Sequence, residues 1–118
     1  MPKKNQIKLG YTTIQHDPRI RHNLSNNEYC IADAIYHLSH NPDSIAVGWC
    51  FARREKLGNF FGLSRRTVIT AIKKLKEKNL VDIDEETNYL RTTKKWYEDF
   101  ILFELHAKEK IGREIIAH

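Results

Sequence analysis

Residues 64–79 read SRRTVITAIKKLKEKN and carry a clear helical pattern. Ser64 is a suitable N-cap because its hydroxyl can accept a hydrogen bond from an unpaired amide of the first turn, and Asn79 can close the other end. At 100° per residue, one narrow face is apolar and the opposite face is polar. The apolar face holds Val68, Ala71, Ile72 and Leu75, and the polar face holds Arg66, Thr70 and Lys73, flanked by Thr67, Ile69 and Lys74. The pattern predicts a helix that packs on one side and presents hydrogen-bond donors on the other.

Residues 55–64, EKLGNFFGLS, lead into this helix and predict a tight turn before it. Gly58 lets two helices cross closely, and Gly62 can take the positive φ that a turn requires. We expect Phe61, Leu63 and Val68 to fill the wedge between the helices. The spacing is that of a helix-turn-helix.

The run Gly-Leu-Ser-Arg-Arg-Thr-Val at 62–68, followed by a lysine-rich helix and Asn-Leu-Val, resembles the winged helix-turn-helix superfamily over residues 49–93. Residues 11–14 (YTTI), then a capped helix and residues 48–52 (GWCFA), resemble the N-terminal domain of phage and plasmid replication-initiation, or replisome organiser, proteins. This resemblance spans most of residues 11–93. It implies a mainly α fold with a small β-hairpin wing (α+β), double-stranded DNA as partner, and contacts with replication proteins. An initiator would normally continue past His118 into a helicase-recruiting region.

A transcriptional repressor of the winged-helix type is the nearest alternative, and a small repressor could end at His118. A hypothesis from a different functional class is that the chain is a protein-interaction module, which uses the winged helix as a scaffold without sequence-specific DNA binding.

The chain of 118 residues, 41% of them apolar, is long enough for one modest core. We divide it into a basic N-terminal arm (1–23), a winged helix-turn-helix domain (24–93) and a long C-terminal helix (94–118). In the arm, residues 11–14 predict a short strand and residues 16–18 a turn.

Residues 25–28, Ser-Asn-Asn-Glu, have the form of a capping box. They predict a first helix that ends near residues 40–42, where proline prevents continuation. Residues 45–51 are rich in β-formers. We expect residues 49–51 to form a small strand beside the wing, with Trp49 in the core.

Residues 80–84 and 89–93 alternate in polarity about 85–88 and predict the hairpin wing. Its tip is acidic, and carboxylates repel phosphate. We therefore expect the tip to stay off DNA, with Arg91 as the only contact from this element.

Residues 94 to about 117 predict a long helix with two apolar faces. One face holds Trp96, Phe100, Phe103, Ala107 and Ile111, and the other holds Ile101 and Leu105. A helix with two apolar faces needs two partners. The second face is expected to form a homodimer through residues 94–117, to bury within the same domain, or to be covered by a further part of a longer chain.

The formal charge of +5 is unevenly distributed. Residues 53–78 carry nine cations and two acids, giving +7, and residues 1–21 carry five cations and one acid, giving +4. Residues 82–86 contain four carboxylates. Basic character concentrated on the helix-turn-helix favours a polyanionic partner.

These patterns assign roles to individual side chains. Base edges in the major groove would be read by Arg66, Thr70 and Lys73, with Thr67 beside them and Ile69 against a thymine methyl. Phosphates would be held by Ser64, Arg65, Lys74 and Lys56, while Arg53 and Arg54 cross the backbone from the preceding helix and Arg91 reaches from the wing. Arg65 can exchange roles with Arg66.

Other chemistry finds little support in the sequence. Cys30 and Cys50 lack metal-ligand spacing and are expected to be buried free thiols. Asp33, His37 and His40 lie at i, i+4 and i+7, but nothing else supports a metal. There is no phosphate-binding glycine loop and no nucleophile motif, so we expect a non-enzyme without a cofactor. No apolar run reaches the length of a membrane span, and we expect a bacterial cytoplasmic or nucleoid location.

Overall fold

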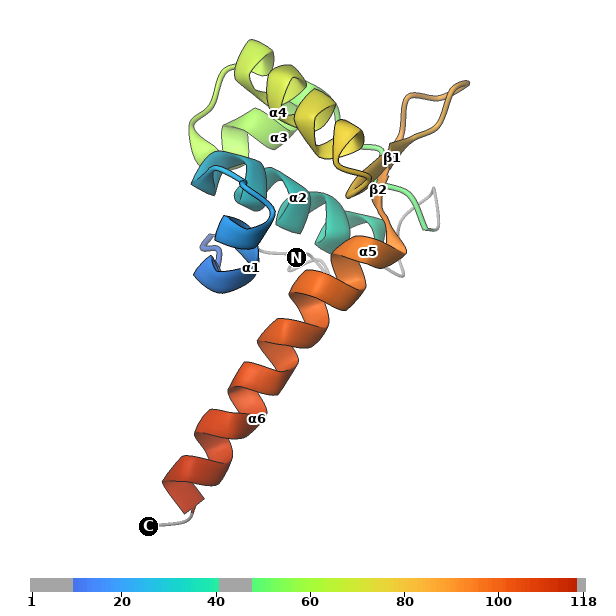
Figure 1. The fold of residues 1–118 in the computed structure, drawn as a ribbon. Coiled ribbons are helices and arrows are strands. Elements are labelled where there is room, and N and C mark those ends of the chain that lie inside the picture. The colour runs from blue at the N-terminus through green and yellow to red at the C-terminus, as the bar shows by residue number, and fades with distance from the viewer. Residues whose placement is uncertain (1–9, 41–47, 117–118) are drawn as a thin grey trace, which may run out of the picture.

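The computed structural model describes residues 10–40 and 48–116, with side chains described as far as residue 109. This part of the chain is mainly helical with one two-stranded antiparallel sheet, an α+β arrangement. In Figure 1, α3 and α4 lie above α2, the hairpin lies at one end of these helices, and α6 extends away from the body. The elements are α1 (His16–Arg21), α2 (Asn26–Ser39), α3 (Arg54–Phe61), α4 (Arg65–Glu77), β1 (Val81–Ile83), β2 (Leu90–Thr92), α5 (Lys94–Trp96), the π-helical segment η1 (Tyr97–Ile101) and α6 (Leu102–Ile116).

Helix α2 packs against α3, α4 and β2. Its predicted capping box is confirmed. Ser25 Oγ accepts the Glu28 N–H at 3.1 Å, and Glu28 Oε1 accepts the Ser25 N–H at 2.9 Å. These bonds satisfy donors that the first turn leaves unpaired. The helix ends at Ser39, close to the predicted end. Its buried apolar side chains are Tyr29, Ile31, Ala32, Ala34 and Ile35.

The turn between α3 and α4 is the predicted one. Gly62 has a φ of +66°, and the Leu63 N–H donates to the Gly58 carbonyl at 2.9 Å. This pattern is a Schellman closure of α3. Val68 is fully buried between the helices, with Phe61 and Leu63 half-buried beside it.

Helix α4 confirms the predicted segment and its two faces. Ser64 caps its start by accepting the Thr67 N–H at 3.1 Å. Asn79 has a φ of +60°, which lets the Leu80 N–H reach the Leu75 carbonyl at 2.9 Å. The predicted apolar residues Val68, Ala71, Ile72 and Leu75 are all buried.

The predicted hairpin is confirmed, with shorter strands. Asp82 pairs with Arg91 in the middle of its register. The turn is closed by the Asp84 carboxylate, which accepts the Thr87 N–H and hydroxyl at 2.9 and 2.7 Å. These hydrogen bonds lower the pKa of Asp84 from its ordinary value. The strand expected at residues 49–51 is reduced to one bridge between Cys50 and Leu90.

The C-terminal helix departs from the regular helix that the sequence predicts. Residues Tyr97–Ile101 form a π-helical turn between α5 and α6. Trp96 and Phe100, both fully buried, stack with ring centroids 4.1 Å apart, and Tyr29 meets both rings edge-on. The aromatic cluster thus anchors the start of this helix, whereas Leu105 on α6 is 46% exposed.

Four further predictions were wrong. Residues 11–14 are not a strand, and residues 16–18 begin α1 instead of a turn, because proline is tolerated in a first helical turn that needs no N–H from it. Trp49 is half-buried, outside the core cluster. Cys30 is also only half-buried, whereas Cys50 is buried as expected. Residues 1–9 of the predicted arm, residues 45–47 of the β-rich segment and the side chain of Ile111 lie outside the described part.

Replacement of Gly58 by alanine tests the α3–α4 crossing. A Cβ there would overlap the Leu63 carbonyl oxygen and approach a Val68 methyl at 3.2 Å. We expect Gly58→Ala to lower the free energy of unfolding by about 1–3 kcal/mol, measured by urea denaturation. Gly10→Ala is the control, because a Cβ at Gly10 meets nothing within 4 Å. Equal stability of the two variants would contradict the close crossing.

Tyr29 predicts a pH dependence of stability. Burial raises the pKa of Tyr29 to about 12, although a hydrogen bond with the Gln15 backbone opposes this. The folded state therefore retains a proton that the unfolded state releases near its ordinary pKa of 10.0, so stability falls as pH rises from there toward 12. We expect the midpoint of urea denaturation to fall less over this pH range in Tyr29→Phe than in wild type. Tyr97→Phe is the control, because the Tyr97 side chain is exposed. An unchanged alkaline slope in Tyr29→Phe would contradict the assignment.

Candidate nucleic-acid interface

The outward face of α4 carries the side chains that the sequence assigns to base reading. Arg66, Thr70 and Lys73 are exposed, and Ile69 is 40% exposed. The Thr70 hydroxyl donates to the Arg66 carbonyl at 3.0 Å, which leaves its oxygen able to accept a hydrogen bond from outside. The helix thus presents cationic donors, a hydroxyl acceptor and an apolar group together.

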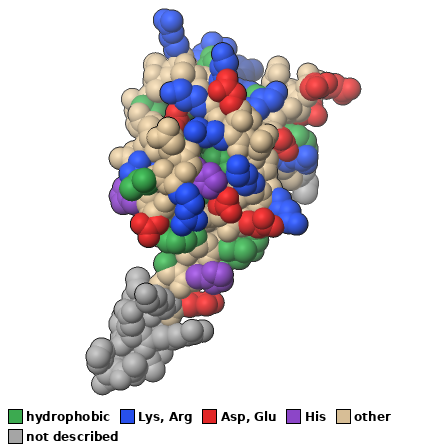
Figure 2. Space-filling view, in the orientation of Figure 1, with side chains coloured by type: hydrophobic (Ala, Val, Ile, Leu, Met, Phe, Trp, Pro, Cys, Tyr) green, Lys and Arg blue, Asp and Glu red, His purple; other side chains and the backbone are tan. Residues whose placement is uncertain are grey.

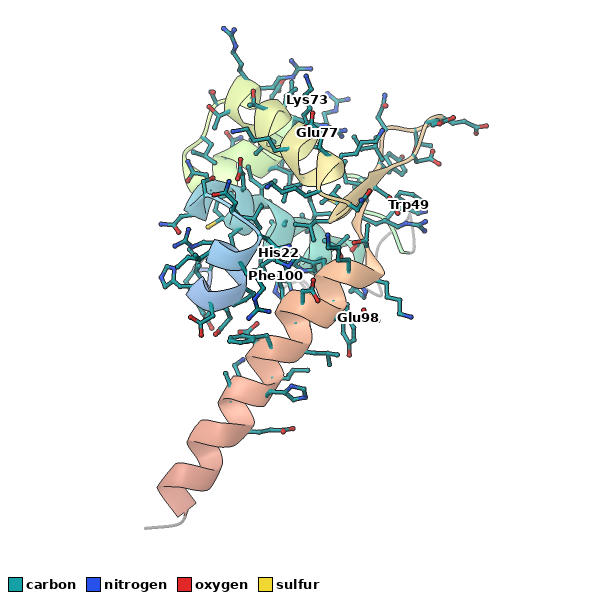
Figure 3. The ribbon with its side chains drawn as sticks, in the orientation of Figure 1. His22, Trp49, Lys73, Glu77, Glu98 and Phe100 are labelled. Atoms are coloured by element: carbon teal, nitrogen blue, oxygen red, sulfur yellow. The ribbon has the colours of Figure 1, made fainter. Side chains whose placement is uncertain are left out.

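Glu77 is an acidic neighbour on α4 that the sequence-based assignment did not consider. It is exposed, and it lies one helical turn beyond Lys73; Figure 3 labels both side chains on this helix. The sequence does contain the signal for this neighbour, because Lys73 and Glu77 are four residues apart and residues at i and i+4 lie next to each other on a helix.

Two of the predicted phosphate-binding cations form ion pairs with neighbouring helices. Arg65 Nε lies 3.7 Å from Glu55 Oε1 on α3, and Lys74 Nζ lies 3.6 Å from Glu28 Oε2 on α2. Arg66 and Lys73 make no ion pair within the part of the chain whose side chains are described. Among the described side chains, the two cations assigned to bases, Arg66 and Lys73, therefore have no carboxylate partner, whereas Arg65 and Lys74, assigned to phosphates, already have one.

Glu28 is a component that sequence reasoning identified only as a helix cap. It is 7% exposed, and its two oxygens serve different partners, the Ser25 N–H and the Lys74 ammonium. It lines a hollow of about 350 Å³ between α2 and α4, together with Ser25, Asn27, Arg66, Thr67, Thr70, Ala71 and Lys74. No local signal indicated this contact, because Glu28 and Lys74 are far apart in the sequence.

Ser64 and Thr67 lie at the start of α4 with their polar groups turned toward each other. Ser64 Oγ accepts the Thr67 N–H and lies 2.9 Å from Thr67 Oγ1. Both hydroxyls thus stabilise the cap, and both side chains remain exposed.

Arg54 links the start of α3 to the hairpin. Its Nη1 donates to the Asn88 carbonyl at 2.8 Å, across 34 residues of sequence. Burial lowers the pKa of Arg54, and the nearby Arg65 lowers it further. An arginine nevertheless stays charged at neutral pH. Arg53 and Lys56 are exposed at the same end of α3.

A cleft of about 830 Å³ opens between the hairpin, the start of α3 and α4. Three of its lining residues are arginines, Arg53, Arg54 and Arg65. Ile69 lines it from α4, Phe51 from the segment that leads into α3, and Tyr89 from the hairpin. The structure therefore gathers into one place four of the predicted site residues, Arg53, Arg54, Arg65 and Ile69.

Arg91 does not join this group. Its guanidinium lies 4.3 Å from the ring centroid of Trp49, and its Nε lies 3.5 Å from Asp82 Oδ2. Arg91 and Trp49 line a separate hollow of about 520 Å³, with Lys76, Ile83 and the carboxylates of Asp82, Asp84, Glu85 and Glu86. The predicted contact from Arg91 is thus placed among acidic residues, because its cross-strand partner in the register is Asp82.

Charge is segregated on the surface as it is along the chain. In Figure 2, lysine and arginine side chains gather over α4, and carboxylates cover the hairpin tip. A surface of this kind attracts a polyanion to α4 and repels it from the hairpin tip.

The described residues contain no group of three His, Cys, Asp or Glu side chains placed to hold a metal ion. His37 instead meets Asp33 at 3.4 Å, and that hydrogen bond raises the pKa of His37. The Cys30 and Cys50 thiols are free, and burial raises the pKa of each. None of the described helices is long and apolar enough to cross a bilayer.

Comparison of the chain with protein-family models, curated proteins and solved structures finds no match.

Removal of the Arg54 side chain tests the link to the hairpin. Arg54→Ala deletes the donor to the Asn88 carbonyl, and we expect local opening of the hairpin tip to become easier by about 1 kcal/mol. Amide hydrogen exchange at residues 87–90 should then accelerate by about fivefold. Arg53→Ala removes the same charge from an exposed side chain and serves as the control. Unchanged exchange in Arg54→Ala would show that the hairpin tip does not depend on this bond.

Proposed function

We propose that this chain binds double-stranded DNA with α4 in the major groove, as a winged helix-turn-helix that recognises an origin or operator site. The observation that carries the proposal is the outward face of α4, where Arg66, Thr70 and Lys73 are exposed together while the opposite face is buried. A helix of ordinary diameter fits the major groove, which is about 12 Å wide.

Arg66, Thr70 and Lys73 would contact base edges. An arginine can donate two hydrogen bonds to guanine, and a threonine or lysine can bond to several acceptors. Ile69 would meet a thymine methyl, and Thr67 would stand beside the same groove wall. These contacts carry sequence information because each base pair presents its own pattern of donors and acceptors.

The remaining cations would hold the backbone. Lys56, Arg53 and Arg54 lie on or beside α3, where a crossing strand would pass. Lys74 and Arg65 would exchange part of their carboxylate pairing for phosphate, so Glu28 and Glu55 act as temporary partners that hold these side chains in place.

The biological role would be initiation of phage or plasmid replication, or transcriptional regulation, within the bacterial cytoplasm or nucleoid. Partners in that setting are replication or transcription proteins. A homodimer through the helix at 94–117 would place two copies of α4 about one DNA turn apart. The exposed Leu105 supports such a pairing.

The second candidate is a protein-interaction module. It is favoured by the same exposed Leu105 and by the acidic hollow around Arg91, which suit apolar and basic partners. Salt-dependent binding to duplex DNA distinguishes the two functions.

The test combines titration of duplex DNA at several salt concentrations with selection of binding sites from a randomised pool. We expect affinity to fall with salt as for about four or more phosphate contacts, together with an enriched motif. A palindrome in that motif would indicate a dimer. Absence of binding at low salt would contradict the DNA-binding proposal and favour the interaction module.

Two substitutions on α4 separate base reading from phosphate contact. We expect Arg66→Ala to cost about 1–3 kcal/mol on the selected site and to relax the preference at one base. Lys74→Ala should weaken all sequences alike and reduce the salt slope by about one. Lys94→Ala, an exposed lysine on α5, is the matched control. Equal losses on selected and random duplexes for both α4 variants would refute the assignment.

A further inference from the structure

We infer that the cleft between the hairpin, the start of α3 and α4 receives a single unpaired nucleotide of the bound DNA, with its base on an aromatic side chain and its phosphate on arginines. This inference rests on the proposed DNA-binding function and adds a preference for DNA that contains an unstacked base.

The size of the cleft suits this occupant. Its volume of about 830 Å³ lies within the range of clefts that bind a small organic molecule. It opens beside Ile69, so an occupant would lie next to the face of α4 that would read paired bases. Binding of a duplex by α4 and binding of an adjacent nucleotide by the cleft are therefore compatible.

Two aromatic rings line the cleft, Phe51 from the segment that leads into α3 and Tyr89 from the hairpin. Phe51 and Tyr89 lie with ring centroids 6.4 Å apart and planes inclined by 60°. Phe51 is 45% exposed, which leaves a large apolar ring facing solvent beside cationic groups. Aromatic side chains next to a positively charged groove are the arrangement by which proteins bind bases of single strands.

The charges of the cleft match a phosphate. Arg53, Arg54 and Arg65 contribute three cations, and Glu55, which is paired with Arg65 at 3.7 Å, contributes the one carboxylate among the lining residues. The lining side chains therefore carry a net charge of +2. Arginine donors can bond to phosphate oxygens in pairs, and a guanidinium can also stack on a base.

The hairpin tip supplies polar groups for a base edge. Thr87 and Asn88 line the cleft and are exposed. Asn88 has a φ of +62°, and its carbonyl is held by Arg54 at 2.8 Å, so its position is defined. A side-chain amide offers both donors and an acceptor, as the edge of an unpaired base requires.

An intact duplex would not use the aromatic rings in this way. Its base faces are covered by stacking, so a ring beside it meets only sugar and phosphate. The carboxylates of Asp82, Glu85 and Glu86 line the separate hollow around Arg91 and repel a backbone there. DNA would therefore approach the hairpin on the side where Phe51 lies. Only an unpaired base has a free face that can stack on the Phe51 ring.

The experiment compares two duplexes of identical sequence, one of which carries a single unpaired thymidine next to the selected site. Fluorescence anisotropy measures both affinities at the same salt concentration. We expect wild type to prefer the bulged duplex by about fivefold to a hundredfold, the range that stacking of one base on an aromatic ring corresponds to. Phe51→Leu keeps apolar bulk but removes the ring, and it should bind both duplexes equally.

Tyr97→Leu is the matched control, because Tyr97 is 41% exposed on η1, outside the cleft, and its loss should leave the preference intact. Permanganate, which oxidises unstacked thymines, supplies a second measurement on wild type alone. We expect bound wild type to protect the unpaired thymine. This readout remains decisive if Phe51→Leu, checked by circular dichroism, fails to fold.

Equal wild-type affinity for the two duplexes, with the thymine still oxidised, would overturn the inference while leaving duplex binding intact. Binding of free thymidine monophosphate without a preference for the bulge would also overturn it, and would assign the cleft to a free nucleotide. Absence of binding to either duplex would overturn the proposed DNA-binding function itself, and this inference with it.

Discussion

Burial of one face of α4 against α2 and α3 is the constraint on which the rest of the arrangement depends. Val68 and Leu75 are fully buried, and Gly58 allows α3 to approach closely enough to cover Val68. Because helical residues are spaced by a fixed rotation, burial of these positions determines which side chains point outward. Arg66 and Lys73 are exposed for this reason. Packing and the candidate interface are therefore two consequences of one helical pattern.

Two long-range contacts attach the hairpin to the segment that leads into α3. Cys50 pairs with Leu90, and Arg54 bonds to Asn88, so the hairpin is connected to the start of α3 at two points. This attachment creates the cleft, whose walls come from three separate segments. It also separates the charges, since three arginines line the cleft while all four hairpin carboxylates line the hollow around Arg91. A nucleic acid would approach one side of the hairpin and be repelled from the other.

Prediction from the sequence succeeded where the signal was local. The capping box at 25–28, the glycine turn at 62 and the two faces of α4 each involve residues within a few positions, and all were confirmed. Two of its failures arose where distant groups interact. The π-helical turn accompanies stacking of Trp96 on Phe100 against Tyr29, and the position of Arg91 follows from its contacts with Trp49 and Asp82. Neither set of contacts can be inferred from the helical or strand periodicity of the sequence.

By itself, the sequence determined the order and type of most elements, the buried side of α4 and the concentration of positive charge around it, because these follow from spacing, capping and composition. Only the tertiary structure decided which cations are paired. It brought Glu28 to Lys74 and Glu55 to Arg65, directed Arg91 toward Asp82, and assembled the cleft around Phe51 and Arg54. The physical reason is that ion pairs and clefts depend on distances between segments, which arise only when the helices and the hairpin pack together.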